Sequence, residues 1–279
     1  MNNILVLQSD FGLDDGAVSA MYGVAKNVSK KLEVFDLTHG ITPFQVTEGS
    51  FRLLQTIPFW PKETVFVSVV DPGVGTLRKS VVAKTKTGHF IVTPDNGTLT
   101  HLKRDIGIVE IREIDESINR LTNSGASHTF HGRDVYAYTG AKLASGKINF
   151  EGVGPLLNVS DIVEFPMTSP TMLNSVITGR IDVLDVRFGH LWTNIPSTMF
   201  KEANINEDEL VTIKIMNKGL TIYNEDIIFV RSFGSVEIGD TLIYINSVMN
   251  VAVAIHQKNF AKVNGVGVGD AWIIEFNKI

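Results

Sequence analysis

The sequence contains no cysteine, which excludes disulfides, thiol nucleophiles, iron–sulfur clusters and cysteine-based zinc sites. It has no Lys/Arg-rich run, which argues against a nucleic-acid backbone as the ligand. The start of the chain lacks the basic head and long apolar core of a signal peptide. The most apolar charge-free stretch, residues 241–257, is shorter than the roughly 20 residues that span a bilayer. We therefore expect a cytoplasmic protein that binds neither nucleic acid nor membrane.

The composition is that of a globular protein. Of the 279 residues, 44% are hydrophobic and 20% are charged. The 25 Lys and Arg residues against 30 Asp and Glu residues give a formal net charge of -5. This length fits one large domain or two ordinary ones.

The first half of the chain alternates strand and helix patterns. Compact apolar runs predict strands at residues 4–8, 32–37 and 64–70, and helical spacing predicts helices at residues 14–28 and 45–57. This βαβαβ order predicts a largely parallel central sheet flanked by helices. Further predicted elements are strands at 81–83, 90–92 and 108–111, and a helix at 133–144.

The second half consists of short strand-like runs separated by Gly, Asn and Asp turns. This pattern predicts an antiparallel β domain, a small barrel or a sandwich. Pro166 and Pro170 interrupt regular structure between the halves. We therefore predict an N-terminal α/β domain over residues 1–168 and a C-terminal β domain over residues 169–279. The runs cover residues 175–184, 210–215, 227–230, 242–245, 251–255 and 271–275.

Two of the predicted parallel strands end in acidic loops. Asp10 follows the first strand and Asp71 follows the third. Ligands bind at the carboxyl ends of the strands in an open parallel sheet, so both carboxylates are expected at one edge. An Asp in such a loop can instead cap the turn. Two acidic loops on the same edge favour a functional role.

Two further residues are candidates for chemistry near this edge. Arg78 lies seven residues beyond Asp71, and the loop is long enough to fold back, although a surface Arg fits equally well. His131 lies just before a predicted helix and is the best of the seven His residues for acid–base work, with helix capping as the alternative. No metal-binding spacing such as HExxH occurs, so no metal site is predicted.

Six short segments, in their order along nearly the whole chain, resemble one family. The resemblance is to the S-adenosylmethionine (SAM) hydrolases, also called SAM hydroxide adenosyltransferases, which are relatives of the fluorinating and chlorinating SAM enzymes. The segments are Ser9-Asp10-Phe11-Gly12, Asp36-Leu37-Thr38-His39, Val70-Asp71-Pro72-Gly73-Val74-Gly75-Thr76, Pro94-Asp95-Asn96-Gly97, Thr129-Phe130-His131-Gly132-Arg133-Asp134 and Phe188-Gly189-His190-Leu191-Trp192-Thr193-Asn194-Ile195.

The resemblance implies a fold, an assembly and a reaction. The fold is an α/β domain followed by a β-barrel, and the assembly is a homotrimer that binds SAM between subunits. The reaction is attack of water on the ribose C5′ of SAM, which gives adenosine and L-methionine with no cofactor and no metal. The catalytic triad of the family falls on Asp71, Arg78 and His131, where Asp71 and His131 orient the water and accept its proton.

The resemblance also implies the substrate contacts. Asp10 would hold the ribose hydroxyls, Phe233 would stack on adenine, Asp185 would hold the methionine ammonium and Ser247 its carboxylate. The family usually has Asn where this chain has His190, and the halogenating relatives have Arg where it has Val248. The full set of expected substrate-binding residues is Asp10, Phe44, Pro72, Thr129, Phe130, Asp185, His190, Phe233, Asn246 and Ser247.

Two other functions remain open at this stage. A halide-dependent SAM enzyme would use chloride or fluoride in place of water, but the carboxylate of Asp71 would repel an anion. A protein that binds SAM or adenosine without turnover would need the same binding residues.

Overall fold

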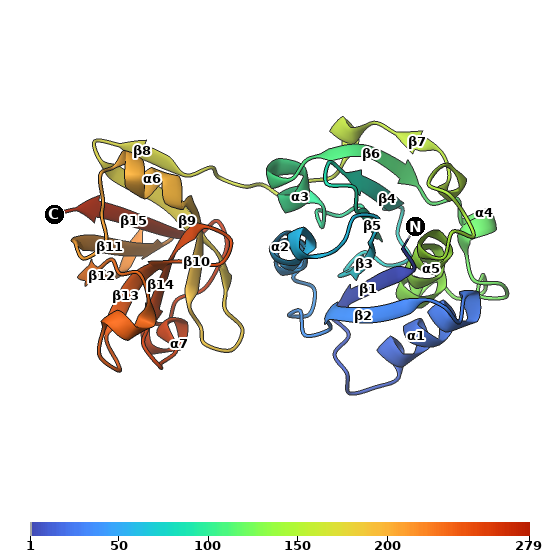
Figure 1. The fold of residues 1–279 in the computed structure, drawn as a ribbon, viewed down its shortest axis with the longest axis horizontal. Helices are drawn as coiled ribbons and strands as arrows, with labels where there is room; N and C mark the ends of the chain where they lie inside the picture. Colours follow the sequence, from blue (N-terminus) through green and yellow to red (C-terminus); the bar gives the residue numbers. More distant parts are fainter. Residues whose placement is uncertain (1) are drawn as a thin grey trace. The chain divides into compact units, whose positions relative to one another are not determined.

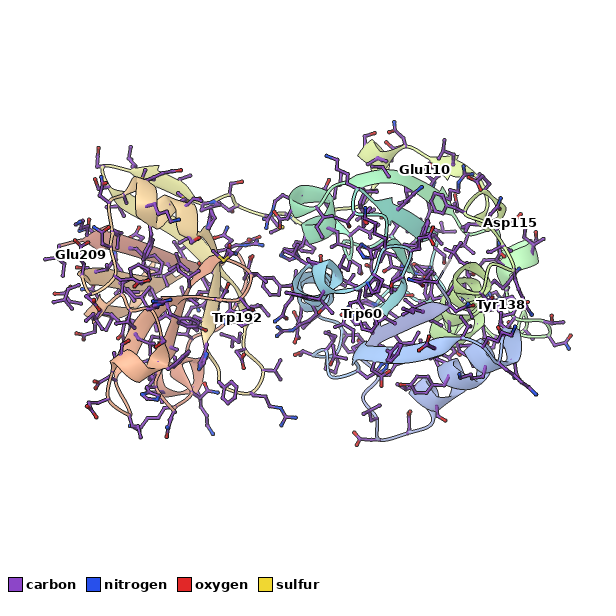
Figure 2. All side chains as sticks on the ribbon, in the orientation of Figure 1. Trp60, Glu110, Asp115, Tyr138, Trp192 and Glu209 are labelled. Carbon is purple, nitrogen blue, oxygen red and sulfur yellow. The ribbon has the colours of Figure 1, made fainter. Side chains whose placement is uncertain are left out.

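The computed structural model describes residues 2–279, which form two compact units that divide between Phe165 and Pro166. Each unit has its own hydrophobic core (Figure 2). The predicted domain boundary after residue 168 stays a prediction, because compactness alone does not show which residues fold together.

A seven-stranded mixed sheet forms the centre of the N-terminal unit, in the order β2-β1-β3-β5-β4-β6-β7 (Figure 1). The four strands from β2 to β5 in this order pair in parallel, and the other three pair antiparallel. The parallel half corresponds to the predicted βαβαβ unit. The strands are β1 Ile4–Ser9, β2 Glu33–Thr38, β3 Val65–Val69, β4 Ser80–Thr85, β5 Phe90–Pro94, β6 Ile108–Glu113 and β7 Leu156–Leu157.

Helices cover both faces of this sheet. Helix α1 packs against α5, and α2 packs against α3 (Figure 1). Strand β1 shows why both faces are apolar: Leu5 and Leu7 point into one core cluster and Val6 into the other. The helices are α1 Ala17–Val28, α2 Val46–Thr56, α3 Thr100–Asp105, α4 Glu116–Asn119 and α5 Tyr138–Ala144, with 3-10 turns at Ile57–Phe59, Glu151–Val153 and Val159–Asp161.

The helix predicted at residues 133–144 has a different beginning from the one expected. A π-helical turn, Gly132–Ala137, precedes α5. Helix α5 then packs very closely on the sheet, since a Cβ at Gly140 would lie 2.5 Å from Cγ2 of Val67. The π-helical turn lies beside the carboxyl ends of the parallel strands. Such turns occur frequently at functional sites.

The C-terminal unit is an antiparallel, nearly closed barrel with the strand order β12-β11-β15-β9-β10-β14-β13 (Figure 1). An isolated bridge between Phe229 and Ile243 joins its two ends. Only short helices accompany it. The elements are β8 Thr171–Leu173, β9 Val176–Leu184, β10 Leu191–Pro196, α6 Ser197–Glu202, β11 Leu210–Asn217, β12 Leu220–Ile228, a 3-10 turn Phe233–Ser235, β13 Thr241–Ile245, β14 Asn250–Ile255, α7 Phe260–Asn264 and β15 Trp272–Lys278.

Two expectations for this unit were wrong. The strand predicted at residues 227–230 is the end of β12, which begins at Leu220 and is mostly exposed, so it lacks the apolar alternation that marks a half-buried strand. Strand β10, which carries Trp192, was not predicted at all (Figure 2). Across residues 2–279, no helix has the length and apolar character needed to cross a membrane.

Candidate active site

The carboxyl ends of β1 and β3 lie side by side, because Ser9 pairs with Val69 in the parallel register. Asp10 and Asp71 follow these strands and face one cavity of about 280 Å³. Six of the predicted site residues line it, together with five that sequence reasoning did not single out. The lining is Asp10, Phe11, Pro43, Phe44, Val69, Asp71, Val74, Thr129, Phe130, His131 and Gly132.

A buried charged network lies at this cavity. The guanidinium of Arg78 donates from Nε to both carboxylate oxygens of Asp71, at 2.8 and 3.0 Å, and from Nη2 to Oδ2 at 2.5 Å. Nη2 also donates to Nδ1 of His131, at 3.1 Å. The side chains of Asp71 and Arg78 are only 5% and 10% exposed. Arg78 therefore joins the loop after β3 to the π-helical segment.

Arg78 has a rigid support beneath it. Its Nη1 donates to Oγ of Ser80 at 3.1 Å, and this hydroxyl is 3.2 Å from the hydroxyl of buried Tyr136. The guanidinium also lies over the ring of Tyr136, 5.6 Å from its centroid. Burial acts to lower the pKa of Arg78, but the hydrogen bonds to Asp71 and the electrostatic interactions with Tyr136, Asp71 and Glu116 together raise that pKa. Arg78 is thus a fixed cation.

The network determines the proton positions on His131. A guanidinium can only donate, so Nδ1 of His131 must accept, and the neutral ring carries its proton on Nε2. Burial, together with the nearby Arg78, lowers the pKa of His131 and favours the same neutral form. Nε2 is buried and has no hydrogen-bond partner among residues 2–279. His131 is therefore neutral, and its Nε2–H is available to donate a hydrogen bond to a ligand.

Asp10 is held from one side only. Its Oδ2 accepts a hydrogen bond of 2.8 Å from the backbone N–H of Phe44. Phe44 has a positive φ of 68°, an unusual conformation for a bulky residue, and its side chain is 69% exposed. Within the described part of the chain, Oδ1 of Asp10 accepts no hydrogen bond. One carboxylate oxygen thus remains for a ligand.

The wall opposite Asp10 is aromatic. Phe11 and Phe130 pack edge to face, with centroids 5.6 Å apart, and Arg133 lies over the ring of Phe130. Gly132 is needed here, because a Cβ would approach Cζ of Phe11 to 2.9 Å. Thr129 continues this wall and is 3.1 Å from the hydroxyl of Ser127. Of the predicted residues in this unit, exposed Pro72 and the partly buried Arg78 do not line the cavity.

The C-terminal unit contains a larger cavity of about 570 Å³. Its floor is a stack of rings: His190 lies between Phe188 and Phe233, with centroid distances of 5.6 and 5.1 Å. Of the five predicted site residues in this unit, His190 and Phe233 line the cavity. The lining is Arg187, Phe188, His190, Phe233, His256, Gln257, Lys258 and Asn259.

A second relay fixes the protons of His190. The indole of Trp192 donates to the hydroxyl of Tyr244 at 3.1 Å, and this hydroxyl lies 3.2 Å from Nδ1 of His190. Since indole can only donate, the phenol proton is available for a hydrogen bond to Nδ1 of His190, an arrangement in which Nε2 carries the ring proton. Burial lowers the pKa of His190 despite Asp185 nearby, and raises that of Tyr244 to about 12. His190 is therefore neutral at pH 7.

The other three predicted residues of this unit lie in turns. Oδ1 of Asp185 accepts from the N–H groups of Arg187 and Phe188, so this carboxylate organises the loop before His190. Asn246 is buried in the β13–β14 turn, where its Oδ1 accepts two backbone N–H groups and its Nδ2 has no partner among residues 2–279. Ser247 is exposed beside it.

No group of three or more His, Cys, Asp or Glu side chains in residues 2–279 is arranged to hold a metal ion. At the N-terminal cavity, the carboxylate of Asp71 pairs with the guanidinium of Arg78, and the carboxylate of Asp10 accepts from the backbone N–H of Phe44.

Comparisons with known proteins find relatives that cover most of this chain. An (R)-S-adenosyl-L-methionine hydrolase of Methanocaldococcus jannaschii is 36% identical over 220 residues, 77% of this chain and 74% of that protein. A fluorinase of an Actinoplanes species is 29% identical over 277 residues, 91% of each. The crystal structure of an uncharacterized conserved protein from Thermotoga maritima is 33% identical, has a TM-score of 0.89 and covers 99% of this chain and 100% of that one.

The family models match both units. The model of the SAM hydroxide adenosyltransferase N-terminal domain matches residues 5–154, and that of the C-terminal domain matches residues 179–273. Together they span most of both units, and the relatives extend the match along the chain. The chain belongs to the SAM hydroxide adenosyltransferase family.

Proposed function

We propose that this protein hydrolyses SAM to adenosine and L-methionine by attack of water on the ribose C5′. The observation that carries the proposal is the Asp71–Arg78–His131 network at the cavity of the N-terminal unit. Family membership supports the substrate, and a relative named as a hydrolase is more similar to this chain than the fluorinase described above.

The reaction balances without a cofactor. The oxygen of water forms a bond to C5′ while the C5′–S bond breaks, and the bonding electron pair stays on sulfur. The sulfonium leaves as the neutral thioether of methionine, and one proton of the water is released. Water is a poor nucleophile, with a pKa of about 15.7 in bulk, so the protein must lower the cost of removing this proton.

The geometry divides this task among the three residues. Asp71 is the acceptor that orients the water and takes its proton, because Nδ1 of His131 already accepts from Arg78. Arg78 stabilises the developing hydroxide by its charge. His131 donates from Nε2 to the oxygen and holds it in line. Attack of a developing anion on a sulfonium removes charge, which a buried, partly apolar cavity favours.

The proposal also assigns the substrate contacts, and the two cavities support part of this assignment. Asp10 accepts the ribose hydroxyls at its unpaired oxygen, with Phe44, Thr129 and Phe130 as the surrounding walls and Pro72 at the edge of the loop. The ring stack of His190 and Phe233 is suited to a planar base such as adenine. The remaining residues, which would hold the methionine end, are Asp185, Asn246 and Ser247.

We further propose that the enzyme is a cytoplasmic homotrimer that needs neither metal nor cofactor. In this assembly, the N-terminal unit of one subunit and the C-terminal unit of a neighbour share each substrate. A mixture of the Asp71→Asn and Asp185→Ala variants then regains activity after subunit exchange, because some sites combine two intact halves. Failure to regain activity despite proven exchange of subunits rules out this sharing.

One experiment separates the three candidate functions. The protein is incubated with SAM in ¹⁸O-labelled water, with and without chloride, fluoride and EDTA. The products are then separated and their molecular masses are measured. Hydrolysis gives ¹⁸O-labelled adenosine and unlabelled methionine, at a rate that EDTA and halides leave unchanged. A 5′-halogenated product indicates a halide enzyme, and bound but intact SAM indicates a binding protein.

A further inference from the structure

A second hydrogen-bonded chain lies next to Asp10, on the side away from the Asp71 network. Its four residues come from β1, α1 and the end of β2. Ser9 Oγ is 2.7 Å from Nδ1 of His39, and Nε2 of His39 is 2.8 Å from Oδ1 of Asp36. The hydroxyl of Tyr22 donates to the same oxygen of Asp36. Ser9 and His39 are 0% and 4% exposed, whereas Asp36 and Tyr22 reach the surface.

One bond direction in this chain follows from the chemistry of its groups. The carboxylate of Asp36 can only accept, so Nε2 of His39 donates to it, and Nδ1 of His39 shares a hydrogen bond with the Ser9 hydroxyl. The Ser9 oxygen in turn accepts the backbone N–H of Phe11, at 3.3 Å. Every group from the surface to this backbone thus has its partner.

This hydrogen-bonded chain is connected to the backbone on both sides of Asp10. Ser9 precedes Asp10 and binds the N–H of Phe11, which follows it. The backbone carbonyl of His39 accepts the N–H of Gly12 at 2.8 Å, and Gly12 needs its positive φ of 68° to make this turn. The loop after β1 is therefore attached to the end of β2 at both flanks of Asp10.

We infer that Asp36, His39 and Ser9, with Tyr22, are positioning residues that set the orientation of the Asp10 carboxylate toward the ribose hydroxyls. The arrangement resembles a nucleophilic Ser–His–Asp triad, but Ser9 is completely buried. It cannot touch a substrate, so its role passes through Asp10. This inference rests on the proposed function, in which Asp10 binds ribose.

The test compares two nucleosides that differ only in the ribose hydroxyls. Binding of adenosine and of 2′,3′-dideoxyadenosine is measured by calorimetry for wild type, His39→Ala and Tyr22→Phe. We expect His39→Ala to weaken adenosine about tenfold, and Tyr22→Phe about twofold, because a misplaced carboxylate loses a charge-assisted hydrogen bond. The dideoxy compound, which has no hydroxyl for Asp10, binds both variants with the same affinity as wild type.

A double-mutant cycle gives the second readout. In an Asp10→Ala background, His39→Ala has no further effect on adenosine binding if it acts only through Asp10. The matched control is His89→Ala, which removes another buried His. His89 makes two hydrogen bonds, to Thr87 and to the carbonyl of Trp60. It lies just before β5, at the amino ends of the parallel strands and away from Asp10. This control lowers stability without changing adenosine affinity.

The outcomes distinguish the two proposals. Equal losses for both nucleosides, or losses that multiply with Asp10→Ala, overturn the positioning role while SAM hydrolysis by the wild type still stands. If His39→Ala does not fold, Tyr22→Phe decides alone, because it removes one hydroxyl near the surface. A wild-type protein that neither hydrolyses SAM nor binds adenosine overturns the function and this inference together.

Discussion

The two units present cavities of opposite character. The N-terminal cavity is the smaller one, and ion-paired and hydrogen-bonded groups with fixed charge lie at it. The C-terminal cavity is twice as large, and its floor is a stack of rings with one neutral imidazole at the centre. Charge held out of water is suited to stabilising a transition state, whereas stacked rings bind planar groups with little effect on reactivity. Under the proposed function, we therefore expect the reaction and ribose binding at the first cavity and binding of the adenine base at the second.

The largest test of this division is removal of the charged network. Asp71→Asn and Arg78→Ala are each expected to lower kcat by about 10²–10³, because each removes an interaction that develops mainly in the transition state. SAM affinity, measured by calorimetry under conditions without turnover, should change far less. Arg78→Lys is the control for charge alone, since Lys cannot contact Asp71 and His131 from one planar group. Near-normal kcat in both variants would contradict the assignment.

The reverse pattern is expected for the ring stack. Phe233→Ala should weaken SAM binding about tenfold, because stacking of a base on an aromatic ring is worth about 1–3 kcal/mol. At saturating SAM, kcat should stay within about twofold of wild type, since the ring touches no reacting atom. Steady-state kinetics over a wide SAM range gives both values. A variant with unchanged KM and low kcat would remove the distinction between the two units.

Acid pH should affect the two units through different parameters. Below the ordinary His pKa of about 6.5, protonation of His131 adds a charge at Nδ1, where Arg78 now donates, so kcat falls. The pKa of His131 is lowered, so this loss occurs only as pH falls well under 6.5, and kcat is flat above it. Protonation of His190, whose pKa is also lowered, should instead weaken SAM binding over the same acid range, and His190→Asn should flatten that response. Profiles of kcat and of Kd against pH separate the two, and an unaltered Kd profile in His190→Asn would exclude His190.

Local patterns predicted much of this site, and long-range contacts account for what they missed. Apolar runs at β1 and β3 are continuous because both faces of the sheet are covered, so the edge that carries Asp10 and Asp71 follows from sequence. The roles of Tyr136 and His39 did not follow, because each depends on a partner from another element: Ser80 is 56 residues from Tyr136, and Ser9 is 30 residues from His39. The first part of strand β12, before residue 227, was missed because an exposed strand has no apolar alternation.

The smallest kinetic effect is expected for a substitution at Gly132, which follows His131 and packs against the rings of Phe11 and Phe130. In Gly132→Ala the new Cβ would be 2.9 Å from the tip of the Phe11 ring and 3.4 Å from Phe130. Gly132 lies in the π-helical turn and has no positive φ, so its backbone accepts Ala, and the Phe11 ring must shift to make room for the Cβ. Because these rings line the cavity but do not touch Asp71, KM should rise about two- to threefold while kcat is nearly unchanged. The matched control is Gly23→Ala on α1, where a Cβ meets no atom within 4 Å and a better helix former should leave KM unchanged and stability equal or higher. A large fall in kcat for Gly132→Ala would show that the aromatic wall and the charged network act as one unit.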